Sequence, residues 1–149
     1  MGRRSRRHAR RPAPRGILIV VDSSAWIELL RRTESRVDRY LTRLLRDRAE
    51  LAVTEVVVLE LLAGARRARD QEEIREMLQG IPVLSLEGLV GYERAASMFR
   101  NCRAAGEAVR SLLDCLVAVP AIDAGAPVLH RDRDFAKLAR HTPLQLVSV

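Results

Sequence analysis

Residues 17–26 read ILIVVDSSAW, and this stretch decides the fold. Five aliphatic residues without polar alternation, 17–21, are typical of a strand that is buried on both faces of a parallel sheet. The two serines that follow can cap a helix, so the stretch predicts a strand that leads directly into a helix. Asp22 stands between the predicted strand and the predicted helix. A buried carboxylate loses hydration worth roughly several kcal/mol unless a cation or hydrogen-bond donors replace the water.

The rest of the chain repeats this alternation of aliphatic runs and helical patterns. Further strands are predicted at 51–53, 81–84, 127–130 and 144–147, and helices at 35–48, 55–63, 71–78, 87–105, 109–123 and 135–140. Apolar strands joined by helices require a parallel sheet that is covered on both faces. We therefore predict a single α/β domain over residues 17–149.

The net charge of +7 is concentrated at the start of the chain. Residues 1–16 hold seven arginines and no acid; removing these seven from the 26 basic residues leaves 19, equal to the 19 acidic ones. This composition is typical of a disordered arm. The arm can bind phosphates nonspecifically. Alternatively, it is a solvated leader without a role, or the start codon was chosen too far upstream. No function is assigned to it.

Apolar stretches and cysteines indicate the compartment. The aliphatic run 17–21 is too short to cross a bilayer or to act as a secretory signal. Cys102 and Cys115 lie in helical patterns without a close cysteine or histidine partner, which favours buried thiols over a disulfide or a zinc site. We expect a cytoplasmic protein with no membrane partner.

Acidic residues interrupt several apolar runs. Glu60 lies within VVVLELLAG, Asp114 lies within SLLDCLVAV, and Asp132 and Asp134 follow PVLHR. Ligands of an open parallel sheet gather outside the carboxyl ends of the strands, where Asp22 and Asp132 are expected. We therefore expect Asp22, Glu60, Asp114 and Asp132 to meet at one edge of the sheet.

Carboxylates without a histidine or cysteine cluster favour a hard, oxygen-preferring cation, Mg²⁺ or Mn²⁺. Such an ion can activate water and offset charge on a phosphodiester, so phosphodiester hydrolysis is the expected chemistry. The number of ions, one or two, is left open.

Each acid also has an ordinary structural interpretation. Asp22, Asp114 and the Asp132 and Asp134 pair can serve only as helix caps or first-turn acids. Glu60 is predicted in the middle of a helix, where it cannot cap.

Two neighbouring polar residues are also ambiguous. Ser23 can bind a water molecule at the site or act as a cap, although Ser24 is the favoured cap. His130 can contact substrate or serve a structural role.

Four stretches together resemble the characteristic blocks of PIN-domain ribonucleases, and among these the VapC-type toxins of type II toxin-antitoxin systems. They are VDSSAWIELL, EVVVLELLAGARR, RSLLDCLVA and GAPVLHRDRDF, in this order from residue 21 to residue 135. The resemblance extends from about residue 17 to the C-terminus. It departs from the family pattern at His130, where many relatives have threonine, and at Pro120, which removes a backbone donor from the predicted helix 109–123.

The resemblance implies a three-layer α/β/α sandwich around a short, mainly parallel sheet of four or five strands. It implies Mg²⁺- or Mn²⁺-dependent cleavage of RNA, either tRNA or ribosomal RNA, by a homodimer that a VapB-type antitoxin inhibits. Asp22, Glu60, Asp114 and Asp132 would be the catalytic quartet and would bind the metal, with Asp134 as a supporting acid or as the fourth ligand itself. Ser23 and His130 would contact substrate or water.

Two other functions are compatible with parts of the sequence. One is a non-catalytic RNA- or DNA-binding module that uses the basic arm. The other is a phosphatase with an aspartyl-phosphate intermediate on Asp22. The second is disfavoured because Ser24 occupies the position where a dehalogenase-like phosphatase would have another aspartate.

Overall fold

A four-stranded parallel sheet runs through the middle of the computed structural model, which describes residues 16–149. The strands are β1 (Ile19–Val21), β2 (Leu51–Thr54), β3 (Val83–Leu84) and β4 (Val128–Leu129), in the order β3-β2-β1-β4. Leu146 adds one parallel bridge to Val128. Four of the five predicted strands are therefore confirmed, while the predicted strand at 144–147 is reduced to a single bridge.

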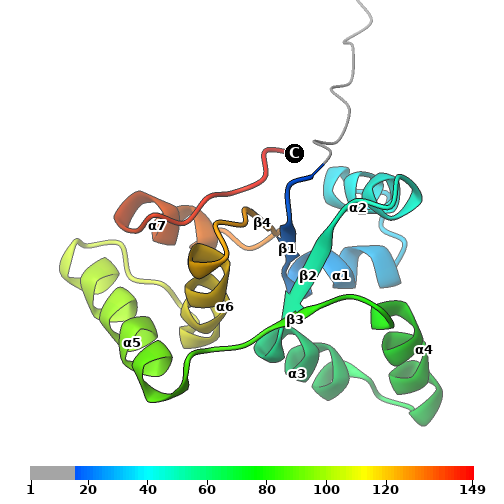
Figure 1. Cartoon of the computed structure of the whole chain (residues 1–149), viewed down its shortest axis with the longest axis horizontal. Helices are drawn as coiled ribbons and strands as arrows, with labels where there is room; N and C mark the ends of the chain where they lie inside the picture. Colours follow the sequence, from blue (N-terminus) through cyan, green and yellow to red (C-terminus); the bar gives the residue numbers. More distant parts are fainter. Residues whose placement is uncertain (1–15) are drawn as a thin grey trace, which may run out of the picture.

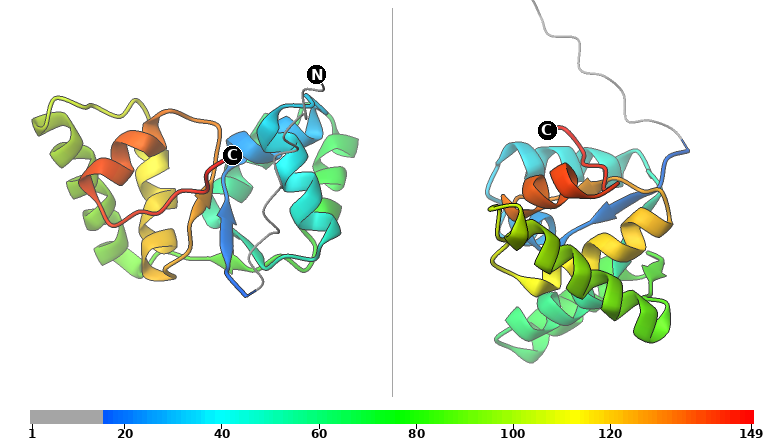
Figure 2. Two further views of the ribbon diagram at one scale, coloured as in Figure 1. Left: turned by 90° about the horizontal axis from the view of Figure 1, so that it is seen from above. Right: turned by 90° about the vertical axis from the view of Figure 1, so that its left-hand side faces the viewer.

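Helices cover the sheet from two sides. They are α1 (Ser23–Leu30), α2 (Arg36–Arg46), α3 (Glu55–Gly64), α4 (Ala68–Leu78), α5 (Gly88–Ala104), α6 (Leu112–Asp123) and α7 (Asp134–His141). Figures 1 and 2 show α1 to α4 on one side of the strands and α5 to α7 on the other. This arrangement confirms the predicted three-layer α/β/α sandwich with a short parallel sheet.

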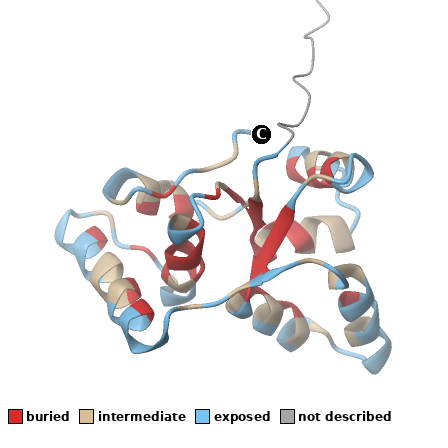
Figure 3. Ribbon diagram, in the orientation of Figure 1, coloured by how far each residue is buried: buried red, intermediate tan, exposed pale blue. Residues whose placement is uncertain are grey.

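The core follows the sheet and the inner faces of the helices (Figure 3). All three residues of β1 are at most 1% exposed, as expected for a strand with neighbours on both edges and both faces. Cys102 and Cys115 are buried free thiols, which confirms their predicted role. Among the described residues, no helix has the length and apolarity needed to cross a membrane.

Side-chain caps set the starts of several helices. Thr54 caps α3 by accepting a hydrogen bond from the amide of Val57. The predicted cap of α1 was wrong: the carboxylate of Asp22, and not Ser24, accepts from the amide of Ser24. The hydroxyl of Ser24 instead donates to Asp22 and accepts from the amide of Arg131.

Helix α6 also begins later than predicted, at residue 112 and not 109, because Ser111 has an extended backbone and caps the amide of Leu113. Pro120 lies inside α6, which continues to Asp123. The arginine-rich arm predicted at residues 1–16 lies outside the described residues apart from Gly16.

The order of the strands positions the candidate site. From β1 the chain moves to β2 and β3 on one side, and later returns to β4 on the other side of β1. Val21 is paired with Leu129, so the segments that follow β1 and β4 emerge next to each other. Ligands of open α/β sheets bind at such a switch point.

Candidate active site

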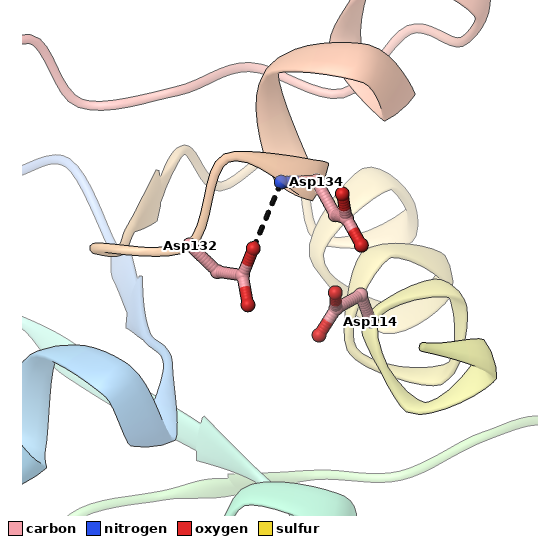
Figure 4. Close-up of side chains that lie close together, drawn as sticks. All are labelled: Asp114, Asp132 and Asp134. Atoms are coloured by element: carbon pink, nitrogen blue, oxygen red, sulfur yellow. Dashed lines mark hydrogen bonds between the residues drawn. The ribbon is translucent and has the colours of Figure 1, made fainter. Parts of the chain in front are cut away.

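Three aspartates form the tightest acidic group (Figure 4). Asp114 comes from the first turn of α6, Asp132 from the loop after β4, and Asp134 from the first turn of α7. One carboxylate oxygen from each lies within 4.8 Å of the other two. The structure therefore brings together three of the five acids predicted from the sequence.

Asp22 is buried at the end of β1 and is hydrogen-bonded to Ser24. It is 3% exposed, and its Oδ2 accepts hydrogen bonds from the amide of Ser24 at 2.9 Å and from the hydroxyl of Ser24 at 2.5 Å. Its Oδ1 is buried and has no hydrogen-bond partner within residues 16–149. One oxygen of this carboxylate thus caps a helix, and the other is left for a different partner.

Glu60 lies on α3 and is linked to α1 through Ser23. The hydroxyl of Ser23 donates to Oε2 of Glu60 at 2.8 Å. Glu60 also lines a pocket of about 390 Å³ between α1, α3 and α4. Because Ser23 follows Asp22 directly, this bond holds the carboxylate of Glu60 close to the end of β1.

The electrostatics connect the two groups of acids. Burial, together with the negative charges of Asp22, Asp132, Asp134 and Glu60, raises the pKa of Asp114 to about 7. Burial likewise raises the pKa of Asp22 and of Glu60, and in Glu60 the charges of Asp22 and Asp132 add to the effect. All five acids therefore face one electronegative region.

Asp134 differs from the others because cations already balance it. Burial alone would raise its pKa, but hydrogen bonds from Lys137 at 2.8 Å and from the Arg110 amide at 2.6 Å hold the pKa below its ordinary value. Asp132 accepts hydrogen bonds from the Asp134 amide and from the Arg110 guanidinium through one oxygen, Oδ1. Asp132 therefore keeps an oxygen open toward the cluster, whereas both oxygens of Asp134 are engaged.

His130 packs its ring against Phe135, with 5.0 Å between the ring centroids. Burial lowers its pKa, although the charges of Asp22 and Asp132 act in the opposite direction. Its Nδ1 is buried without a hydrogen-bond partner in the described chain. A contact between His130 and substrate stays a prediction.

Sequence reasoning did not assign Arg110 and Lys137 to the site. Arg110 opens the block RSLLDCLVA, and Lys137 is the only lysine in the chain. Only their nearness in sequence to a motif acid indicated that Arg110 and Lys137 could belong to the site. Their contacts with Asp134 form only when the chain folds.

The residues present fit a hard divalent cation. Asp22 Oδ1 and Asp114 Oδ2 are both buried carboxylate oxygens that meet no donor in residues 16–149. Leaving such oxygens without a partner is costly, and Mg²⁺ or Mn²⁺ binds this type of ligand. With Asp132 they form an all-oxygen donor set, and no histidine or cysteine joins the clustered acids among the described residues.

Residues 19–141 match the family model for the PIN domain, so the chain belongs to the PIN-domain family. Within this family it belongs to the group of VapC ribonucleases. It is 39% identical over 132 residues to VapC ribonuclease Mb1587 of Mycobacterium bovis and to ribonuclease VapC11 of Mycobacterium tuberculosis. The alignments cover 88% of this chain and 98% of each relative.

Solved structures with the same fold are toxin-antitoxin complexes. VapBC2 of Rickettsia felis, bound to a DNA fragment from its promoter, matches with a TM-score of 0.68 at 14% identity and covers 88% of this chain and 98% of its own. VapBC-5 of Mycobacterium tuberculosis matches with a TM-score of 0.63 at 21% identity, covering 89% and 98%. At these identities the likeness shows the fold.

Proposed function

We propose that this chain is a Mg²⁺- or Mn²⁺-dependent endoribonuclease that hydrolyses RNA phosphodiester bonds in the cytoplasm, as the toxin of a VapBC-type pair. The observation that carries the proposal is the pair of buried carboxylate oxygens on Asp22 and Asp114 that have no hydrogen-bond partner in the described part of the chain, in a region that contains three further acids. The names of the mycobacterial relatives support the reaction and the class of substrate.

Asp22, Glu60, Asp114 and Asp132 are the acids that would hold the cation. Asp134 is the supporting acid, because Lys137 and Arg110 occupy its two oxygens. A bound Mg²⁺ or Mn²⁺ lowers the pKa of water and offsets negative charge on the phosphate during displacement.

The protein's own residues prepare this chemistry. The hydroxyl of Ser24 fixes the carboxylate of Asp22, and the hydroxyl of Ser23 orients that of Glu60. Without a cation, the raised pKa of Asp114 means that this carboxyl holds a proton for much of the time near neutral pH. A divalent cation held by these carboxylates would relieve the repulsion among them and would favour the ionised form of Asp114.

The direct test is RNA cleavage by the purified chain. We expect cleavage with Mg²⁺ or Mn²⁺ and loss of cleavage with EDTA, with Asp22→Asn or with Asp114→Asn. Glu55→Gln is a matched control, because Glu55 is an exposed acid on the same helix as Glu60 and its partner is Ser85. Full activity of either aspartate variant would overturn the proposed site.

A VapB-type antitoxin is the proposed partner, supported by the structural neighbours, which are VapBC complexes. The pocket beside Glu60 has an apolar wall, to which Ile27, Leu30 and Leu61 contribute, and would receive an apolar side chain of that partner. Co-expression with a cognate VapB-type protein should suppress cleavage. Leu30→Glu should weaken that suppression, and equal suppression of both proteins would contradict the use of this pocket.

A homodimer is the proposed assembly. Leu89, Val90 and Tyr92 at the start of α5 are 73%, 58% and 54% exposed, and α5 forms one outer side of the molecule (Figure 1). Apolar side chains grouped in this way are typical of an interaction surface. Light scattering should give twice the chain mass, and Leu89→Glu should reduce it; a monomeric wild-type chain would contradict this assembly.

A further inference from the structure

Arg110 lies in the loop between α5 and α6 and places its guanidinium beside the acidic cluster. Its Nη2 is 3.1 Å from Oδ1 of Asp132, and its Nε is 3.4 Å from Oδ2 of Asp134. The side chain is nevertheless 72% exposed. A cation thus lies at the edge of the proposed catalytic site with most of its surface in solvent.

The position of this loop does not depend on the guanidinium. The backbone amide of Arg110 donates to Asp134 at 2.6 Å, and Lys137 donates to the carbonyl of Ala108 at 2.9 Å. Glu107 accepts three further hydrogen bonds from the end of α7. These contacts hold the loop against α7 when the Arg110 side chain is removed.

The side chain itself contributes little to stability. Solvent screens the ion pairs of an exposed guanidinium, and the buried carboxylate of Asp134 keeps its bonds to Lys137 and to the Arg110 amide when that guanidinium is lost. A guanidinium carries five N–H donors in a planar fork that matches phosphate oxygens, and within residues 16–149 only Nε and Nη2 are engaged. The remaining donors are available to a ligand that approaches from solvent.

We propose that Arg110 is a substrate-binding residue of the site, whose guanidinium contacts the non-bridging oxygens of the phosphate that is cleaved. This inference rests on the proposed ribonuclease function and names a residue that acts on its substrate. In hydrolysis, water forms a new bond to phosphorus, the bond to one ribose oxygen breaks, and that oxygen ends with a proton while the phosphate keeps the added oxygen. Negative charge on the phosphate oxygens grows before the bond breaks, so a fixed cation there accelerates the reaction.

The experiment compares Arg110→Ala and Arg110→Lys with Arg94→Ala. Arg94 is a matched control because it also forms an ion pair, with Asp123 at the opposite end of α6 from Asp114. Cleavage is measured in single turnover, with the enzyme in saturating excess over the RNA and with saturating Mn²⁺. We expect Arg110→Ala to lower the rate by about 100-fold, Arg110→Lys to restore part of it, and Arg94→Ala to leave it unchanged.

A binding measurement gives a second readout that does not depend on turnover. In EDTA, the affinity for a short single-stranded RNA is followed by fluorescence anisotropy as the salt concentration increases. Loss of one phosphate contact should reduce the slope of log affinity against log salt by about 0.7 in Arg110→Ala. The melting temperatures of Arg110→Ala and Arg94→Ala should be similar, because both guanidinium groups are exposed and Asp134 keeps its bonds to Lys137 and to the amide of residue 110 in Arg110→Ala.

Three results would overturn the inference. The first is a cleavage rate of Arg110→Ala equal to that of the wild type. The second is a rate deficit that disappears at higher Mn²⁺, which would mean that Arg110 only adjusts cation binding. The third is an unchanged salt slope. A wild-type chain that cuts no RNA would overturn the proposed function and this inference together, whereas the three results above leave the proposed function intact.

Discussion

The metal-free protein should lose stability as the pH rises through neutrality, and Asp114 should be the main cause. Its pKa is about 7 in the folded protein against an ordinary value of 3.8. Between these two values the folded chain binds more protons than the unfolded chain, so the free energy of unfolding falls as the pH rises. The contribution of protonated Asp114 is therefore complete below about pH 4 and is lost as the pH passes about 7.

The size of the effect follows from the same two values. A difference of about 3 pKa units corresponds to a total cost of about 4 kcal/mol at high pH. Only part of this cost appears in the pH range that is practical for an unfolding experiment. Between about pH 5.5 and about pH 8.5 the free energy of unfolding should fall by about 2 kcal/mol. His130 acts in the opposite direction at the acidic end, because its lowered pKa makes protonation unfavourable in the folded state.

The assay is urea unfolding in EDTA across this pH range, comparing the wild type with Asp114→Asn. Taking the difference between the two proteins cancels His130 and other groups that both share. The stability of the wild type relative to the variant should fall by about 2 kcal/mol from the lowest to the highest pH. A difference independent of pH would refute the reasoning, and saturating Mn²⁺ should stabilise the wild type more than the variant.

Three further substitutions test separate contacts. Glu60→Gln should weaken Mn²⁺ binding in a calorimetric titration without lowering the melting temperature in EDTA, because it removes one of the clustered charges; a lower melting temperature would contradict this. Ser24→Ala removes the hydroxyl that donates to Asp22 and should cost about 1 to 2 kcal/mol in urea unfolding, whereas an unchanged value would show that the backbone cap suffices. Gly91→Ala would place a Cβ 2.9 Å from Leu86 Cδ2 and 3.1 Å from its Cβ, so we expect a loss of about 1 to 3 kcal/mol by the same method, and equal or higher stability would count against this packing.

The sequence predicted the features that depend on short stretches of chain. Aliphatic runs predicted the positions of the parallel strands, since a strand buried on both faces needs apolar residues at every position. The same logic identified Asp22 and Asp114, because a carboxylate inside an apolar run is unusual. Both are buried in the structure.

Features that depend on contacts between distant residues were not predicted. The first turn assigned to the helix at 109–123 is in fact a loop, since the amide of Arg110 bonds to Asp134, 24 positions away. Contacts between distant residues also explain why both carboxylate oxygens of Asp134 are hydrogen-bonded while one oxygen of Asp132 stays open. Lys137 and Arg110 engage Asp134 only in the folded chain. Local sequence patterns contain no information about such pairs.

The pairing of β1 with β4 also has a consequence for how the chain is made. Val20 is paired with Val128, so the central strand gains its second neighbour only after most of the protein has been synthesised. A nascent chain that has emerged as far as α5 includes Asp22 and Glu60, but not Asp114 or Asp132. The repulsion that Asp114 and Asp132 add to that between Asp22 and Glu60 therefore arises only in the last stage of folding, when the strands already formed can support it.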